Sequence, residues 1–172
     1  TASGYNAPTF PIGSAYVLAY AKKTLGGDFD YRLFKFPEQL ASAIMERPPA
    51  ILALSNFSWN CELAYKINCW AKEQYPYLIS IFGGLNFPIV AEEKLEFLKQ
   101  YSAIDFYIEI EGEYGFSNLV QKILEYDLDI DKLKAQSGPL SNCSYLLNGQ
   151  LVSGPTERIQ KLDEIPSPYL TG

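Results

Sequence analysis

The chain has 172 residues, 48% of them hydrophobic and 20% charged, so it is long enough to bury the core of one globular domain. A net charge of −6 without a basic cluster argues against a nucleic-acid-binding surface, and no apolar stretch approaches the ~20 residues that cross a bilayer. Histidine, the commonest general base and metal-binding side chain, is absent, and the three cysteines (Cys61, Cys69, Cys143) lack CxxC spacing, which indicates reduced thiols in the cytoplasm.

After a loop over residues 1–13, the chain is expected to alternate helices with strands. The apolar periodicity predicts helices over residues 15–25, 37–46, 62–74, 91–101 and 116–126, and strands over residues 31–35, 50–54, 78–82 and 105–109. Ser14 is the expected N-cap of the first helix, and Gly26-Gly27 its end. Strand–helix units at regular spacing predict an α/β fold with a parallel sheet and helices on both of its faces.

The central stretch of the chain is YLISIFGGLNFP, residues 77–88. Its apolar run over residues 78–82 shows no alternation, which is typical of a strand buried on both faces in a parallel sheet. The run stops at Gly83-Gly84, at the carboxyl end of the strand, where ligands bind in open α/β sheets. The glycine pair either lets a ligand approach the backbone closely or simply makes the turn to the next helix. Because the chain opens with a helix, although the first strand of such folds is usually central, we also expect a strand upstream of Thr1.

The last fifth of the chain differs in character. Asn148-Gly149 lies between two short β-prone runs, which predicts a β-hairpin. The residues that follow contain three prolines and no apolar period, which indicates an extended linker toward another domain. We therefore expect an α/β domain over residues 1–135 and a hairpin with a linker over residues 136–172.

Three predicted loops should meet at one edge of the sheet, because the carboxyl ends of parallel strands lie together. They combine hydroxyls, amides, glycines and aromatic side chains, which suits a large organic ligand held by a few polar contacts. None contains GxxxxGK[ST], or GxGxxG after a strand, so a phosphate or dinucleotide site has little support. The candidate site residues are Ser55, Asn56, Phe57, Ser58, Trp59, Gly83, Gly84, Leu85, Asn86, Glu111, Gly112 and Glu113.

Some of these residues have a structural alternative. Trp59 either covers a bound ligand or fastens its loop to the following helix; its place beside polar residues, outside any core period, favours the ligand. Asn60 is expected to cap the helix that starts near Glu62. Glu111 and Glu113 are unpromising for acid–base catalysis, because two residues apart in a loop they need not face each other. One of them at a helix N-terminus is ordinary dipole complementation.

Five motifs in this order resemble the cobalamin-binding domain at the front of radical SAM proteins. Residues 10–16 (FPIGSAY) resemble the P-L-G-L-A-Y opening of that family's first helix, and residues 55–60 (SNFSWN) its S-x-x-x-W-N loop. Residues 83–86 (GGLN) are similar to its GGP-type loop, and residues 111–116 (EGEYGF) contain its G-E-x-x-F element. Residues 162–169 (LDEIPSPY) resemble the exit toward the radical SAM barrel. Each motif is short, but five in order over most of the chain are specific.

The resemblance implies a Rossmann-like (flavodoxin-like) domain that binds cobalamin at the carboxyl edge of its sheet. In the wider cobalamin-binding group the equivalent of Ser55 contacts the nucleotide tail, and the equivalents of Gly83 and Gly84 admit that tail. The D-x-H-x-x-G loop of that group, whose histidine ligates cobalt, has no counterpart here because the chain has no histidine. The lower face of the cobalt would then carry water, another residue or nothing.

The implied function is that of a cobalamin-binding domain of a B12-dependent radical SAM enzyme, methyltransferase-like or related. The CxxxCxxC triad that holds a [4Fe–4S] cluster is absent, so the cluster and S-adenosylmethionine are expected in a C-terminal radical SAM domain of the same polypeptide. This chain alone is then not catalytic, and neither nucleic acid nor a membrane is an expected partner. The alternative is a degenerate domain without cofactor that serves as a packing or substrate-access module. A stand-alone flavodoxin-like regulator is a weaker third hypothesis.

Overall fold

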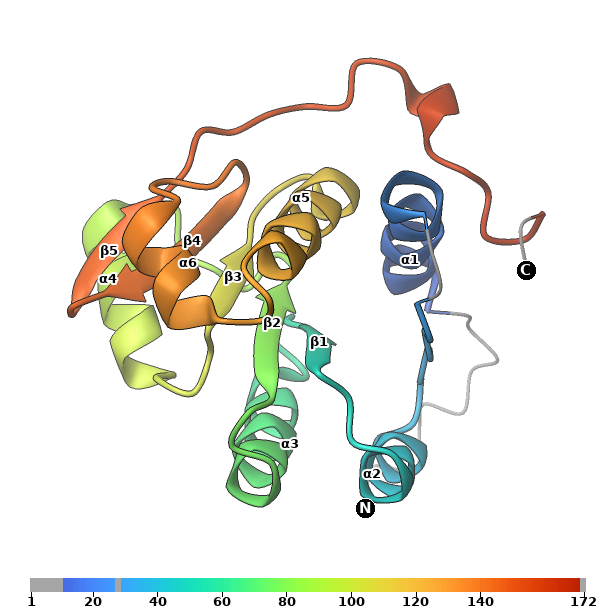
Figure 1. Ribbon diagram of the computed structural model, residues 1–172, viewed down its shortest axis with the longest axis horizontal. Coiled ribbons are helices and arrows are strands. Elements are labelled where there is room, and N and C mark those ends of the chain that lie inside the picture. Colours follow the sequence, from blue (N-terminus) through green and yellow to red (C-terminus); the bar gives the residue numbers. More distant parts are fainter. Residues whose placement is uncertain (1–10, 27–28, 171–172) are drawn as a thin grey trace.

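One five-stranded sheet forms the centre of the chain in the computed structural model, which describes residues 11–26 and 29–170. The strands lie in chain order: β1 (Ile51–Ser55), β2 (Ile79–Gly83), β3 (Phe106–Ile108), β4 (Cys143–Leu147) and β5 (Gln150–Ser153) (Figure 1). β1, β2 and β3 are parallel, whereas β4 pairs antiparallel with β3 and with β5. The predicted α/β fold with parallel strands is confirmed, and the C-terminal hairpin continues the same sheet.

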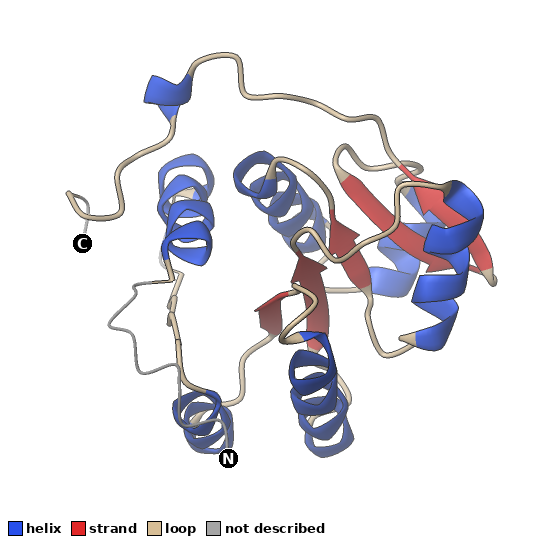
Figure 2. Cartoon of the chain, turned by 180° about the vertical axis from the view of Figure 1, so that it is seen from behind, coloured by secondary structure: helices blue, strands red, loops and turns tan. Residues whose placement is uncertain are grey.

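Helices pack on both faces of the sheet, as predicted (Figure 2). They are α1 (Ile12–Leu25), α2 (Pro37–Glu46), α3 (Cys61–Gln74), α4 (Ala91–Gln100), α5 (Gly112–Glu125), α6 (Ile130–Gln136) and the short 3-10 helix η1 (Leu162–Glu164). α1 packs beside α5, and the two run side by side in both views (Figures 1 and 2). No helix in the described part of the chain is long and apolar enough to cross a membrane.

The apolar run over residues 78–82 shows no alternation because successive side chains of β2 pack into cores on opposite faces of the sheet. Ile79 and Ile81 pack in the cluster that includes residues of α5 and α6. Phe82 packs on the other face, in the cluster that includes Ala64 of α3 and Leu98 of α4. All of these side chains are buried, as an apolar run without alternation predicts. The polar residue of the strand, Ser80, is buried too, and its hydroxyl donates a hydrogen bond of 2.8 Å to the Ala103 carbonyl.

Two predictions about the N-terminal part were wrong. Residues 31–35 form no strand; they are an extended segment between α1 and α2 that pairs with no neighbouring strand among the described residues. An alternating pattern suits a pleated backbone, but a strand also needs a hydrogen-bonded neighbour. α1 begins at Ile12, after Pro11, and therefore Ser14 lies inside its first turn and is not its N-cap. Residues 1–10 of the predicted loop and Gly27 of the predicted helix end lie outside the described residues.

The C-terminal part contains one helix that the sequence analysis missed. α6 starts after Asp129, whose side chain accepts a hydrogen bond of 2.9 Å from the backbone N–H of Lys132. An acidic cap before an apolar residue and Gly138 just beyond the helix were the signals that could have identified it. The hairpin is confirmed: Asn148 (φ 51°) and Gly149 (φ 75°) both adopt the left-handed backbone that a tight two-residue turn requires.

Candidate functional site

The three predicted loops leave the sheet at the same edge. In the parallel register, Ser55 at the end of β1 lies beside Gly83 at the end of β2, and Gly83 lies beside Ile108 at the end of β3. The loops after these three residues therefore start next to one another. The expectation that they converge on one rim of the sheet is confirmed; whether they bind a ligand is a separate question.

Two asparagines join the first loop to the second. Asn56 Nδ2 donates to the backbone carbonyl of Asn86, and Asn86 Nδ2 donates to the side-chain Oδ1 of Asn56, both at 3.3 Å. The backbones are joined as well, since Asn56 N–H donates to the Gly83 carbonyl (2.7 Å) and Asn86 N–H to the Asn56 carbonyl (3.2 Å). Asn56 is fully buried. Both residues thus shape the loops, and their side chains are engaged with each other.

The two glycines differ in what requires them. Gly84 has φ 133°, and a Cβ built on it would lie 2.3 Å from the Asn56 carbonyl oxygen. Close packing of the two loops therefore accounts for Gly84 without any ligand. A Cβ on Gly83 would meet only Ile108, at an ordinary 3.6 Å. The fold itself would accept a methyl group at Gly83.

Two packed aromatic side chains, Tyr107 and Phe87, support the second loop. The sequence analysis placed Tyr107 in a strand but gave it no role. The hydroxyl of Tyr107, a fully buried residue of β3, donates to the Gly84 carbonyl at 3.1 Å. Phe87 stacks on the Tyr107 ring, with centroids 3.9 Å apart, and also contacts Phe97 of α4 edge-on. Burial raises the pKa of Tyr107 well above its ordinary value, so the hydroxyl keeps the proton that it donates.

The first loop is closed by Asn60, in a way that differs from the prediction. Asn60 stands at the N-cap position of α3 but makes no side-chain capping bond to the helix. Its Oδ1 instead accepts from Phe57 N–H (2.7 Å), and its Nδ2 donates to the carbonyl and the hydroxyl of Ser55 (3.0 and 3.3 Å). Ser55 itself is exposed. A serine hydroxyl in this position still has its own proton to donate to a ligand.

Each of the three site loops also carries an exposed apolar side chain. Trp59 stacks on Phe57 with centroids 4.7 Å apart, yet 80% of its surface is exposed. Leu85 in the second loop is 87% exposed, and Ile110 in the third is 56% exposed. Trp59, Leu85 and Ile110 are called the apolar rim below. Trp59 is thus largely exposed, whereas Phe87 packs inward against Tyr107 and Phe97.

The third loop is shorter and opens directly into α5. Glu111 is the N-cap residue of α5, and its Oε1 accepts a hydrogen bond of 3.1 Å from Arg158 of the C-terminal tail. Gly112 and Glu113 form the first turn of the helix, where a Cβ on Gly112 would lie 3.2 Å from Val17 of α1. Glu111 occupies the N-cap position without a side-chain capping bond, and Glu113 lies in the first turn. No carboxyl–carboxyl contact joins them among the described interactions.

A polar cluster at the end of β3 was not identified from the sequence. Glu109 forms an ion pair with Lys94 of α4 (2.5 Å) and accepts a hydrogen bond from the Ser144 hydroxyl of β4. The Ser144 hydroxyl lies 2.6 Å from that of Ser153 in β5. The Glu109 and Lys94 side chains are only 18% and 14% exposed, so the pair is largely withdrawn from solvent. It ties the start of the third loop to the helix and hairpin beside it.

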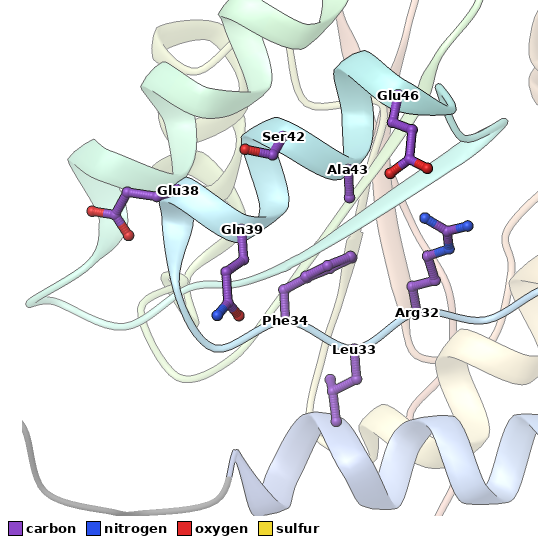
Figure 3. A pocket seen from close by; sticks show the side chains of 8 residues that line it. All are labelled: Arg32, Leu33, Phe34, Glu38, Gln39, Ser42, Ala43 and Glu46. Carbon is purple, nitrogen blue, oxygen red and sulfur yellow. The ribbon is translucent and has the colours of Figure 1, made fainter.

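The surface hollow of about 670 Å³ shown in Figure 3 lies elsewhere. It is formed by the extended segment Arg32, Leu33 and Phe34 against α2, and no residue of the three site loops lines it. Figure 3 shows the Phe34 ring lying between that segment and the helix.

Comparison with known proteins connects this geometry to a group of enzymes. No family model matches the chain. It is 28% identical, over 98% of its length, to a protein of Streptantibioticus cattleyicolor named 2-(S-pantetheinyl)-carbapenam-3-carboxylate methyltransferase. It is 27% identical, over 96% of its length, to the cobalamin-dependent radical SAM methyltransferase TokK of Streptomyces tokunonensis. The chain is homologous to part of these methyltransferases. The resemblance seen in the sequence motifs is confirmed.

The chain spans about a quarter of these relatives, 24% of each. The solved structure of OxsB, a cobalamin-dependent S-adenosylmethionine radical enzyme with aqua-cobalamin and S-adenosylmethionine bound, superposes on 95% of the chain with a TM-score of 0.66 and 21% identity. The structure of OxsB with aqua-cobalamin alone gives 0.67 over 96%. In each case the match covers 22% of OxsB. At this identity the likeness shows the shared fold.

Proposed function

We propose that this chain is the cobalamin-binding domain of a B12-dependent radical SAM enzyme that is methyltransferase-like or related. The observation that supports the proposal is the convergence of the Ser55, Gly83 and Ile108 strand ends on one rim of the sheet, with the apolar rim around them. This arrangement occurs in a chain whose relatives include a cobalamin-dependent radical SAM methyltransferase.

The residues present fit a corrinoid. Ser55 offers an exposed hydroxyl at the end of β1 for the polar tail of the cofactor. Gly83 has no side chain although the fold leaves room for one, which suits a ligand that lies against that backbone. The apolar rim, Trp59, Leu85 and Ile110, suits the hydrophobic periphery of the macrocycle.

The bound cofactor would supply the methyl-transfer chemistry, and this chain would bind and orient it. Because the chain has no histidine, it provides no imidazole for the cobalt. Asn56, Asn86, Glu111 and Gly112 would act by shaping the three loops, since their contacts are with other parts of the protein. Glu113 would complement the dipole at the first turn of α5. Phe57 would hold the Trp59 ring, and Ser58 lies exposed between them.

The proposed partner is a radical SAM domain of the same polypeptide, with its [4Fe–4S] cluster and S-adenosylmethionine. The chain matches only a quarter of the two methyltransferases, and exposed apolar side chains next to a ligand site suit burial against another domain. We retain residues 1–135 as the binding domain and 136–172 as the hairpin and linker toward that partner. We also propose that a strand upstream of Thr1 pairs with β1, which is the edge strand of the described sheet. The free thiols suit the cytoplasm.

The decisive experiment is a titration of the full-length protein with hydroxocobalamin, followed by the corrin absorption bands. Unchanged bands at a large excess of protein would overturn the proposal. The discriminating variant is Gly83→Ala, because the fold accepts the added methyl group and a ligand lying on that backbone would not. We expect at least tenfold weaker binding with unchanged thermal unfolding. The matched control is Gly13→Ala, where a Cβ meets nothing within 4 Å, and binding should be unchanged.

A further inference from the structure

The tail after β5 returns across the domain and is fastened to it at several points. Figure 1 shows the tail passing from β5 over α5 toward α1. Near its start, the Pro155 carbonyl accepts a hydrogen bond of 2.9 Å from the Asn142 backbone N–H. Near η1, the Glu164 carbonyl accepts one of 2.6 Å from Lys23 Nζ of α1. Between these two points, the tail contacts Asn142 and the third loop of the candidate site.

Asn142 connects the tail to the end of β3. Its side chain pairs with the backbone of Glu157 in both directions: Nδ2 donates to the Glu157 carbonyl (3.0 Å), and Oδ1 accepts from the Glu157 N–H (2.7 Å). The same Nδ2 lies 3.3 Å from the Glu109 carbonyl, and the Asn142 carbonyl accepts from the Glu109 N–H (2.8 Å). Asn142 is 98% buried and has φ 56°, a left-handed conformation that asparagine tolerates. One buried amide thus holds two segments that are far apart in the sequence.

The segment held at β3 contains an unfavourable backbone conformation. Ile110 has φ 62°, a region that β-branched residues rarely adopt. Its side chain is more than half exposed, so burial does little to compensate. Both neighbours are fixed from outside: Glu109 through Asn142, and Glu111 through Arg158 of the tail. A strained residue persists where the surrounding structure determines its conformation.

The tail also contacts the first turn of α5, just after the turn at Ile110. The Glu157 carboxylate accepts a hydrogen bond of 2.6 Å from the Ser141 hydroxyl. It is also hydrogen-bonded to Tyr114 in the first turn of α5, and this bond raises the pKa of Tyr114. Bonds from Ser141 and Tyr114 lower the pKa of Glu157, so the carboxylate stays ionised at neutral pH. The tail therefore contacts both the turn and the helix that carry the third site loop.

We propose that Asn142 is a positioning residue that clamps residues 154–158 of the tail against residues 109–114, and that this clamp holds the third site loop with Ile110 directed outward. Asn142 does not contact the ligand itself. The effect on cobalamin rests on the proposed function, whereas the clamp can be tested without any ligand. If both hold, ligand binding and closure of the clamp favour each other by the same factor.

The test variant is Asn142→Asp in the full-length protein, compared with Asn148→Asp. Aspartate keeps the size, the acceptor oxygen and the tolerance of positive φ, but it loses the donors to the Glu157 and Glu109 carbonyls. Asn148 has nearly the same backbone conformation (φ 51°) in the exposed hairpin turn, so it controls for the chemical change. Hydrogen exchange is measured without cobalamin. We expect at least tenfold faster exchange over both 110–116 and 154–160 for Asn142→Asp, and no change there for Asn148→Asp.

Faster exchange over residues 154–160 alone would overturn the proposal, because the tail would then be released without freeing the turn. If Asn142→Asp does not fold, the double variant Glu157→Gln with Arg158→Gln replaces it, since both side chains are exposed. It should speed exchange at least threefold in both segments, and no change over 110–116 would refute the clamp.

The ligand arm uses the same proteins and hydroxocobalamin. Asn142→Asp should raise the dissociation constant at least tenfold, and Asn148→Asp less than twofold. Equal binding by Asn142→Asp and the unmodified protein would refute the positioning role while the proposed function stands. If the unmodified protein does not bind, the proposed function fails, and the exchange measurement still decides whether the clamp exists.

Discussion

Gly84→Ala tests how tightly the first two site loops depend on each other. The new Cβ would be 2.3 Å from the Asn56 carbonyl oxygen, in a backbone with φ 133°, so the loops must move apart. That movement strains three hydrogen bonds: Asn56 N–H to Gly83, Asn86 N–H to Asn56, and Tyr107 hydroxyl to Gly84. Each contributes about 0.5–1.5 kcal/mol net, and the positive φ adds about 1 kcal/mol. If all three bonds are lost, we expect the free energy of unfolding to fall by about 2.5–5.5 kcal/mol.

Guanidinium unfolding with linear extrapolation measures this change, and Gly138→Ala separates its two causes. Gly138 also has a positive φ (66°), but a Cβ there meets nothing within 4 Å. It should lose only about 1 kcal/mol, the conformational part. Equal losses in the two variants would refute the argument, because they would mean that the contact between the loops adds nothing to the cost.

Three further changes test the surroundings of the site. Tyr107→Phe removes the bond to Gly84 and should lower the free energy of unfolding by about 1 kcal/mol. Because burial raises the pKa of Tyr107, the folded state keeps this proton longer than the unfolded state, so stability should fall above pH 10 in the unmodified protein and less in the variant. Ile110→Gly relieves about 1–2 kcal/mol of backbone strain but adds about 0.5–1 kcal/mol of conformational entropy to the unfolded state. The free energy of unfolding should therefore stay the same or rise slightly. A loss above about 1 kcal/mol in urea unfolding would contradict this. Lys134 lies over the Phe106 ring, and burial lowers its pKa. The folded state therefore releases this proton at a lower pH than the unfolded state, so the free energy of unfolding should increase as pH rises toward 10.5. Lys134→Met should lose that increase, and identical pH profiles of the two proteins would refute the burial effect.

Much of the candidate site follows from local patterns in the sequence. The apolar run of β2 and the glycines after it place Gly83 and Gly84 at the carboxyl end of a buried strand, and the same reasoning places Ser55. The strand predicted over residues 31–35 failed because alternation shows which side chains could share a face, but not whether a second backbone is available to pair. The helix missed after Asp129 is short, so its period is weak and only its cap could have indicated it.

The sequence by itself determined most of the strands and helices, and that three loops meet at one rim of a parallel sheet, because these depend on side-chain periods and chain order. Only the tertiary structure decided what the loop residues do. It shows Gly84 packed against Asn56, Tyr107 supporting the second loop, and Asn142 joining β3 to the tail. These roles depend on contacts between residues that are 15 to 33 positions apart, and no local pattern specifies which buried polar groups will satisfy each other.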